Sequence, residues 1–252
     1  MQPADMTNRT AIVTGAASGL GRATALALGA AGADLWLVDV NATGLQQTVD
    51  QLRERGVRAE AIPADLSSRD ECLKVVPAAL AAFGRLDALC NVAGVLFLGE
   101  STDMPADRVE KVLAVNLKAP FFLTQAAIPH LLEANGAVVN VSSTAGFVGQ
   151  AYSAVYCASK AGLTHMTKSL AMEYMHKPIR FNAVAPGGMD TGLVADMKIP
   201  ETIDLSLMQR YSGIRGLIEV EDVANVIAFL ASPAAQAFHG ACISVDKGIT
   251  AG

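Results

Sequence analysis

Charged residues are scarce in this chain, and clusters of basic charge are missing. Only 17% of the 252 residues are charged, the formal net charge is −5, and the lysines and arginines are scattered. Nucleic acids and anionic membrane surfaces attract proteins through concentrated positive charge. We therefore expect no nucleic acid and no membrane among its partners.

Cysteine is rare and widely spaced. The four cysteines, at positions 72, 90, 157 and 242, form no C-x-x-C pair and no metal-ligand grouping with the four histidines. This pattern predicts free thiols and no bound metal. The first residues lack a basic and apolar leader, and no apolar run approaches about 18 residues without polar interruption. We expect a cytoplasmic protein.

Hydrophobic residues, by contrast, make up 52% of the chain, which is enough for a core that buries secondary structure on both faces. No linker rich in proline, glycine or serine divides the sequence, so we expect one domain over residues 1–252. Apolar runs of strand length alternate with helical segments. This alternation predicts right-handed βαβ units and a parallel sheet.

The boundaries of these elements follow from composition and periodicity. Strands are expected at 10–14, 34–39, 57–64, 86–91, 137–143, 179–184 and 242–246. Helices are expected from 21 to about 31, then at 44–55, 65–83, 107–132, from 153 onward, and at 221–232.

A glycine-rich turn, Thr14-Gly-Ala-Ala-Ser-Gly-Leu-Gly21, joins the first strand to the first helix. Glycines permit a tight turn and the close approach of a pyrophosphate, and a helix N-terminus offers free N–H groups. Gly15, Gly19 and Gly21 leave three residues and then one, so their spacing differs from G-x-G-x-x-G. The alternative is a glycine-lined turn that holds no ligand.

Asp39 ends the second strand, 18 residues beyond Gly21, where a ribose contact is expected. Its carboxylate can accept hydrogen bonds from both ribose hydroxyls and would repel a 2′-phosphate. Ser18 precedes Gly19 where a basic residue could compensate, and we expect Arg22 to point away from the ribose. The sequence thus predicts NAD(H), not NADP(H), with a helix cap as the alternative role for Asp39.

Tyr156 and Lys160 stand four residues apart in helical composition and so share a helix face. A free phenol has a pKa of ~10. Lowering that pKa to about 7 requires roughly 4 kcal/mol of additional stabilisation of the phenolate, and a nearby ammonium can supply part of it. Ser143 ends the preceding strand, where its hydroxyl can hold a substrate oxygen. Taken alone, Tyr-x-x-x-Lys is a weak pattern that a solvated surface helix also carries.

Asn116 lies in an apolar part of the long helix expected at 107–132. An asparagine inside a helix is usually a satisfied polar group. Pro120 follows four residues later, and its missing N–H predicts a kink or a freed carbonyl near Asn116.

These motifs, in this order and across nearly the whole chain, resemble the single-domain branch of the short-chain dehydrogenase/reductase family. The resemblance implies a doubly wound, Rossmann-type α/β fold with a seven-stranded parallel sheet and helices on both faces. It also implies an oxidoreductase that uses NAD to interconvert a secondary alcohol and its ketone. A homotetramer or homodimer is implied as well, through the long helices that carry Asn116 and Tyr156.

The resemblance further assigns roles to residues. Tyr156 would be the general acid/base, Lys160 would lower its pKa and hold the nicotinamide ribose, Ser143 would polarise the substrate oxygen, and Asn116 would hold a water in a proton relay. The remaining cofactor contacts would be Gly15, Ser18, Gly19, Leu20, Gly21, Asp39, Asp65, Leu66, Asn91, Ala93, Gly94, Pro186, Gly187, Met189 and Thr191.

The small-molecule substrate is expected under a long irregular segment at about 187–216. An apolar, cyclic or bulky substrate is predicted because apolar residues lie on the segments expected around the site. They are Val95, Leu96, Phe97, Phe147, Val148, Met189, Leu193 and Met197. Two alternatives are a 3-oxoacyl-carrier-protein reductase, which calls for basic residues near the cleft, and a dinucleotide-sensing protein without catalysis.

Overall fold

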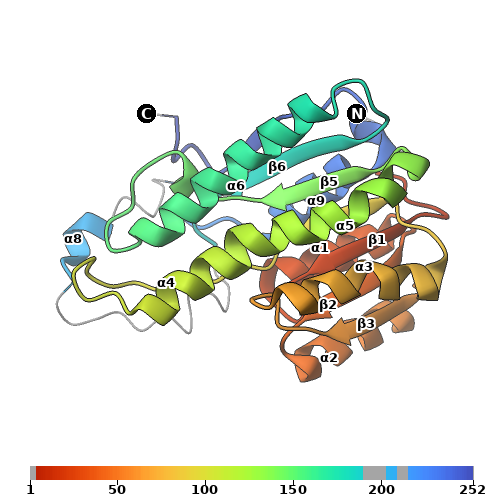
Figure 1. Cartoon of the computed structure of the whole chain (residues 1–252), viewed down its shortest axis with the longest axis horizontal. Coiled ribbons are helices and arrows are strands. Elements are labelled where there is room, and N and C mark those ends of the chain that lie inside the picture. The colour runs from red at the N-terminus through yellow and green to blue at the C-terminus, as the bar shows by residue number, and fades with distance from the viewer. Residues whose placement is uncertain (1–3, 190–202, 209–214, 252) are drawn as a thin grey trace.

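Seven parallel strands form one sheet in the computed structural model of the chain, which describes residues 4–189, 203–208 and 215–251. The strand order is β3-β2-β1-β4-β5-β6-β7, and neighbouring strands are parallel throughout (Figure 1). The strands are β1 (Thr10–Thr14), β2 (Asp34–Asp39), β3 (Ala59–Pro63), β4 (Ala88–Asn91), β5 (Ala137–Val141), β6 (Arg180–Pro186) and β7 (Cys242–Val245).

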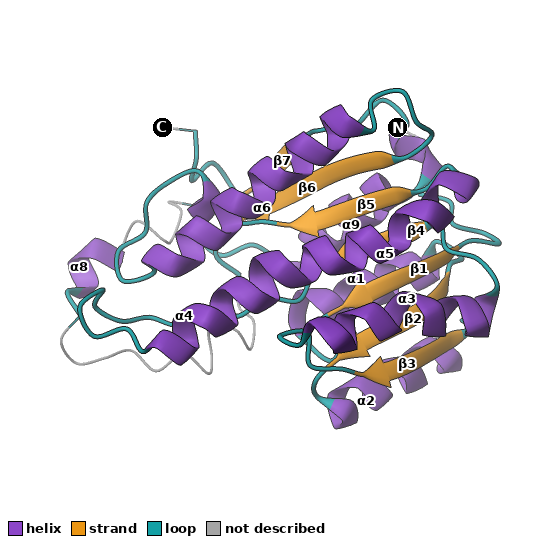
Figure 2. Ribbon diagram, viewed as in Figure 1, coloured by secondary structure: helices purple, strands orange, loops and turns teal. Residues whose placement is uncertain are grey.

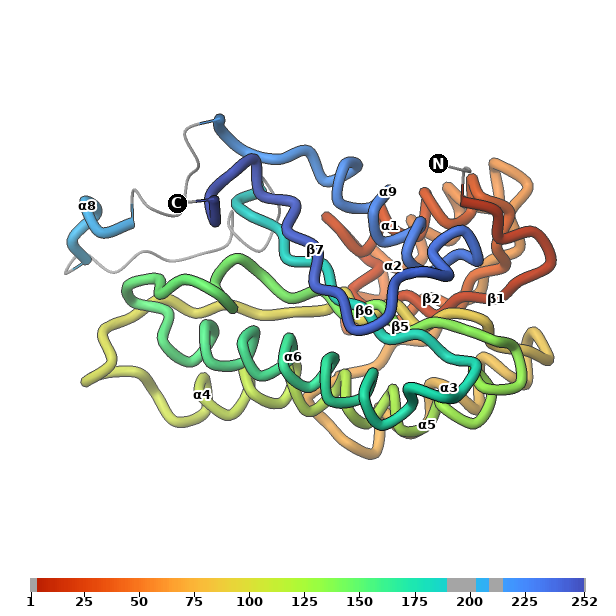
Figure 3. The backbone as a smooth tube through the Cα atoms, turned by 90° about the horizontal axis from the view of Figure 1, so that it is seen from above, coloured from red at the N-terminus to blue at the C-terminus, as the bar shows by residue number. Residues whose placement is uncertain are grey.

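Helices cover both faces of this sheet (Figure 3). One layer consists of α1 (Gly19–Ala30), α2 (Ala42–Glu54) and α9 (Val220–Ala231). The opposite layer consists of α3 (Arg69–Phe83), α5 (Ala119–Ala134) and α6 (Ala154–Glu173), and α4 (Ala106–Leu113) continues the line of α5 beyond the sheet (Figure 2). The doubly wound α/β fold predicted from the sequence is thereby confirmed.

The strands bury both of their faces, as the continuous apolar runs predict. In β1, Ala11 and Val13 join the core beneath α1 and α9, whereas Ile12 joins the core beneath α3 and α5. Trp36 of β2 lies on the same side as Ile12 and packs edge-on against Phe83 of α3. Alternate residues of one strand therefore supply two separate cores, because successive side chains point to opposite faces.

The long helix expected at 107–132 is interrupted. A π-helical turn at Ala114–Lys118 separates α4 from α5, and the N–H of Ala119 donates to the carbonyl of Ala114, five residues back. Pro120 explains the interruption, because it cannot donate to the carbonyl of Asn116 in the i→i−4 pattern. The combined run Ala106–Ala134 is long and apolar enough to cross a membrane by length and composition alone, and 44% of its most apolar window is buried in the fold.

The segment expected to cover the substrate, at about 187–216, is described in part. Its residues 190–202 and 209–214 lie outside the described residues. Leu205–Met208 forms a short helix, α8, where the sequence predicted irregular structure. Met189 and Ile218 form an isolated parallel bridge near the two ends of the segment.

A buried carboxylate fixes the edge of the sheet where the strands begin. Asp87, directly before β4, accepts from the backbone N–H of Thr10 at 2.9 Å, from Arg85 at 2.7 Å through two nitrogens, and from Arg9 at 3.1 Å. Its side chain is 1% exposed. These contacts join the start of β1 to the start of β4.

Replacing this carboxylate should destabilise the protein strongly. We expect Asp87→Ala to lower the free energy of unfolding by about 3 kcal/mol, because it leaves two arginines and a buried N–H without their acceptor. Urea denaturation at fixed protein concentration measures the change. As a control, Glu71→Ala removes the exposed ion pair with Lys74 and should cost less than about 1 kcal/mol. Equal effects of the two substitutions would contradict this account of Asp87.

Candidate active site

A cavity of about 1090 Å³ lies where the parallel strands end. The chain crosses to opposite faces of the sheet after β1 and β4, which opens a crevice between the loops that follow these two strands. The predicted site residues that line this cavity are Gly15, Ser18, Gly19, Leu20, Gly21, Asp39, Asp65, Leu66, Ala93, Gly94, Ser143, Tyr156, Lys160, Pro186, Gly187 and Met189.

The glycine turn leaves room for a ligand beside the N-terminus of α1. Gly15 has φ +70°, and a Cβ on it would lie 2.9 Å from the Cα of Ala93, so a larger residue does not fit. Ser18 at the N-cap makes no side-chain capping bond. The free N–H groups of this helix end therefore face the cavity without a protein cap, which suits the phosphates of a dinucleotide.

Asp39 lines the cavity at the end of β2 and is held by backbone donors. Its carboxylate accepts from the N–H of Ala17 at 3.0 Å and from the N–H of Asn41 at 2.9 Å. Asn41, and not Asp39, caps α2, because its side chain accepts from the N–H of Gly44. Arg22 bonds to Thr48 at 3.0 Å and to the carbonyl of Ala17, and it does not line the cavity.

Asp65 and Leu66 follow β3 and form the wall next to Asp39. Hydrogen bonds from the side chain and backbone of Ser67 lower the pKa of Asp65, and the charge of Lys111 adds to the effect. Asp65 therefore carries a negative charge at neutral pH. Leu66 contributes a buried apolar surface to the cavity wall.

Asn91 was predicted to touch the cofactor, but the structure does not bring it to the cavity. It is 2% exposed, and its amide donates to the side chain of Asn140 in the neighbouring strand at 2.8 Å. The turn after β4 is instead fixed by Thr14, whose hydroxyl accepts from the N–H groups of Val92 and Ala93. Val92, Ala93 and Gly94 of this turn line the cavity, and Asn91 does not.

Asn116 also lies behind the cavity wall. Its amide donates to the carbonyl of Val95 at 2.9 Å, and its oxygen accepts from the N–H of Val95 at 2.8 Å. A third bond, at 3.2 Å, reaches Ser159 of α6. The side chain thus fixes the strand-end segment that carries Val95 against two helices. Thr191, the remaining predicted residue, lies outside the described residues.

Ser143, Tyr156 and Lys160 meet at one end of the cavity. The Ser143 hydroxyl acts to lower the pKa of the Tyr156 phenol, and it accepts from the N–H of Ala145 at 3.1 Å. The Lys160 ammonium lies 5.7 Å from the centre of the Tyr156 ring and donates to the carbonyl of Val141 at 2.8 Å. A hydroxyl, a phenol and an ammonium therefore converge where a small oxygen-bearing ligand can reach them.

Burial dominates the electrostatics of this trio. Removal from water raises the pKa of Tyr156, and the hydrogen bond from Ser143 opposes that rise. Burial also lowers the pKa of Lys160 to about 8. The sequence predicted that the lysine would lower the pKa of the tyrosine, but burial is the largest influence on that pKa and raises it. The phenol is therefore protonated at neutral pH.

The apolar lining agrees in part with the residues expected around the substrate. Val95, Leu96, Phe97 and Met189 line the cavity. Phe147 and Val148 do not line it; they are exposed directly after the 3₁₀ turn Thr144–Gly146. Leu193 and Met197 lie outside the described residues.

Several residues that line the cavity were not predicted from the sequence. Leu205, Met208 and Leu217 add apolar surface, whereas Gln150, Arg108 and Lys111 add polar groups. Arg108 and Lys111 are three residues apart and so share a face of α4. That spacing is visible in the sequence, but nothing local indicates which face of the helix meets the cavity.

Comparison with known proteins places this site in a family. The family model described as Enoyl-(Acyl carrier protein) reductase matches residues 15–250. The chain is 41% identical to a cis-4-hydroxycyclohexanecarboxylate dehydrogenase of Sinomonas cyclohexanicum over 96% of this chain and 97% of that protein. It is 36% identical to a cyclohexanol dehydrogenase of an Acinetobacter strain, over 96% and 95% of the two chains.

Solved structures agree with these relatives. A short chain dehydrogenase from Burkholderia cenocepacia, crystallised in complex with NADP, superposes with a TM-score of 0.88 at 32% identity, covering 97% of this chain and 98% of that one. The parallel seven-stranded sheet, the glycine turn, the Ser143, Tyr156 and Lys160 group and the full-length matches lead to one assignment. The chain belongs to the short-chain dehydrogenase/reductase family.

Proposed function

We propose that this oxidoreductase is an NAD(H)-dependent dehydrogenase of secondary alcohols on a six-membered ring. The observation that carries the proposal is the meeting of Ser143, Tyr156 and Lys160 at the apolar end of a cavity whose other end suits a dinucleotide. Its relatives act, by their names, on cyclohexanol and on a hydroxycyclohexanecarboxylate. Both substrates carry the reacting hydroxyl on a ring.

Tyr156 is the residue best placed to exchange the proton of the substrate oxygen. Its phenol and the Ser143 hydroxyl line the same cavity and influence each other electrostatically, so both can contact one alcohol or carbonyl oxygen. In oxidation the phenolate takes the hydroxyl proton while the C–H bond breaks, and in reduction the phenol returns a proton to the oxygen. Ser143 donates to that oxygen and stabilises negative charge on it in the transition state.

Lys160 supports Tyr156 through charge, since its buried ammonium lies beside the ring and favours the phenolate. A bound nicotinamide cofactor would supply the hydride acceptor or donor. Gly15, Ser18 and Gly19 would hold its phosphates, and Asp39 its adenosine ribose.

NAD(H) is proposed over NADP(H) because Asp39 places a carboxylate where a 2′-phosphate would lie. Arg22, the nearest cation in sequence, is occupied by Thr48 and the carbonyl of Ala17 and is not available to offset that repulsion. A relative of known structure was crystallised with NADP, so membership of the family does not by itself decide between the two cofactors. The proposed preference of this chain rests on its own Asp39 and Arg22.

We also propose that copies of this chain associate through α4, α5 and α6. Phe121 is 42% exposed on α5, and its ring packs against that of Phe122. A second copy would cover this apolar surface.

Removal of the Tyr156 hydroxyl should abolish turnover. On a panel of cyclic secondary alcohols and short 2-hydroxy acids, we expect the wild type to prefer the cyclic alcohols. Tyr156→Phe should lose about a thousandfold or more in kcat, because the proton acceptor is gone, and should retain cofactor binding. Nicotinamide absorbance measures the rates.

The rate of oxidation by the wild type should depend on pH. Because burial raises the pKa of Tyr156, this rate should increase as the pH rises into the alkaline range, where the phenolate forms.

Tyr174→Phe is the matched control, since Tyr174 packs on Phe181 and does not line the cavity. It should keep wild-type kinetics. Substantial activity of Tyr156→Phe, or no turnover of any alcohol by the wild type, would refute the proposed function.

The charge of Asp39 should set the cofactor preference. We expect kcat/KM for NAD to exceed that for NADP about a hundredfold, the equivalent of roughly 3 kcal/mol in repulsion and lost hydrogen bonds. Asp39→Asn keeps the size of the side chain and removes the charge, so it should narrow the ratio mainly by improving NADP. A wild-type enzyme that uses both cofactors equally would rule this explanation out.

The proposed association predicts a particle of two or four chains. Sedimentation at micromolar concentration should give two or four times the 26.1 kDa mass of the chain. Phe121→Glu should shift the mass downward, because it would place a charge in the covered surface. A monomer mass for the wild type would contradict the proposal.

A further inference from the structure

Arg108 gives the substrate end of the cavity a positive charge that neither catalysis nor cofactor binding uses. It lines the same cavity as Ser143 and Tyr156. The acids that line the described part of the cavity are Asp39 and Asp65, which lie at the ends of β2 and β3 on the dinucleotide side. The charge of Lys111, the next cation along α4, helps to lower the pKa of Asp65. Arg108 thus has no counterpart of opposite sign at its own end.

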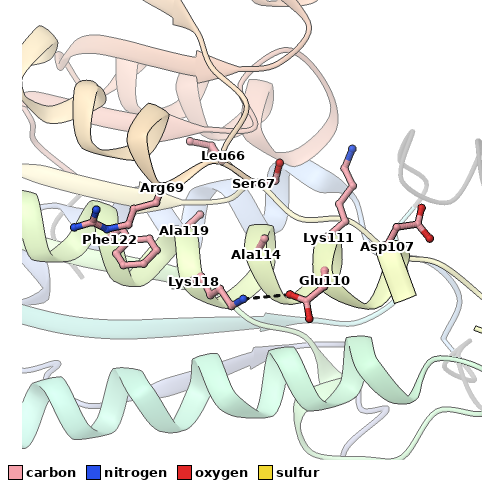
Figure 4. A pocket seen from close by; sticks show the side chains of 10 residues that line it. All are labelled: Leu66, Ser67, Arg69, Asp107, Glu110, Lys111, Ala114, Lys118, Ala119 and Phe122. Carbon is pink, nitrogen blue, oxygen red and sulfur yellow. Dashed lines mark hydrogen bonds and ion pairs between the residues drawn. The ribbon is translucent and has the colours of Figure 1, made fainter. Parts of the chain in front are cut away.

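The acids of α4 do not neutralise Arg108 either. Glu110 is paired with Lys118 at 3.3 Å, and Asp107 faces a second, smaller cleft of about 590 Å³ (Figure 4). None of the ion pairs found among residues 4–189, 203–208 and 215–251 includes Arg108. A cation in the first turn of a helix also opposes the helix dipole, so Arg108 does not stabilise α4 electrostatically.

Phe97 connects Arg108 to the apolar cluster that includes Tyr156. The Arg108 guanidinium carbon lies 5.2 Å from the centre of the Phe97 ring, a cation–π contact that restricts the side chain. Phe97 packs against the apolar cluster formed by Val112, Ala145 and Tyr156. An apolar surface therefore extends from the catalytic phenol to the guanidinium.

Helix geometry gives the scale of this surface. Arg108 and Val112 are four residues apart, so they share a face of α4 and are separated by about 6 Å along its axis. Val112 belongs to the cluster of Tyr156. The backbone of Arg108 therefore lies about one helical turn from a residue that belongs to the Tyr156 cluster.

We propose that Arg108 is a specificity residue that binds a carboxylate carried by the ring of the alcohol, on the side opposite the reacting hydroxyl. The inference rests on the proposed function for the identity of that hydroxyl. Arginine suits this task because its planar guanidinium donates two parallel hydrogen bonds to a carboxylate. The substrate class is then a hydroxylated cyclic carboxylic acid, with an apolar ring between two polar ends.

Kinetics on a matched pair of substrates tests the proposal. The pair is 4-hydroxycyclohexanecarboxylate and its neutral primary amide, assayed with NAD. We expect kcat/KM of the wild type to be about tenfold higher for the carboxylate, mostly through KM, because an exposed charge pair contributes modestly. In Arg108→Gln, kcat/KM for the carboxylate should fall by that tenfold factor, and kcat/KM for the amide should change less than twofold. Lys118→Gln removes the same charge from the same helical run outside this cavity and should leave the ratio unchanged.

A binding measurement separates this inference from the proposed reaction. Calorimetry on the NAD-saturated protein compares cyclohexanecarboxylate with cyclohexanecarboxamide, neither of which can react. We expect Arg108→Gln to weaken the carboxylate about tenfold and to leave the amide unaffected. If binding responds in this way but no alcohol turns over, the proposed function fails and the carboxylate site stands. If alcohols turn over but Arg108→Gln changes neither the substrate ratio nor carboxylate binding, the inference is wrong.

Discussion

The attachment of α6 to β5 is the constraint on which the site depends. Residues in and just after the strand bond to successive turns of the helix. Asn140 donates to Thr167 at 2.9 Å, Lys160 donates to the Val141 carbonyl at 2.8 Å, and Ser142 bonds to the Lys160 carbonyl at 3.0 Å and to Thr164 at 2.6 Å. These buried contacts fix how far α6 lies along the strand. They bring Tyr156, one turn before Lys160, beside Ser143.

The same burial sets the chemistry of the site. A lysine and a tyrosine removed from water both favour their neutral forms, so the pKa of Lys160 falls to about 8 and that of Tyr156 rises. The lowered pKa of Lys160 costs stability at neutral pH, and the hydrogen bond to Val141 offsets that cost in part. The raised pKa of Tyr156 costs stability only in the alkaline range, where an unfolded phenol would ionise. Burial also places the phenol in apolar surroundings, where its pKa responds strongly to a nearby charge.

The sequence by itself determined the elements and the identity of the reacting groups. Strands with two apolar faces alternate with helices, and this pattern fixes a parallel sheet. The glycine turn could be predicted because its backbone conformation is local: Gly15 adopts φ +70°, a region that favours glycine. Tyr156 and Lys160 could be paired because their four-residue spacing places them on one helix face in any fold. Pro120 likewise indicated the break in its helix, since its missing N–H is a local property.

Only the tertiary structure decided which polar side chains face the cavity. Asn91 turns toward Asn140 of the next strand, Asn116 bonds to the Val95 backbone, and Arg108 reaches the cavity. Each outcome depends on contacts between segments that are distant in sequence, and a local pattern carries no record of them. The balance of pKa values was decided in the same way, because desolvation depends on everything packed around a group and not on its neighbours in the chain.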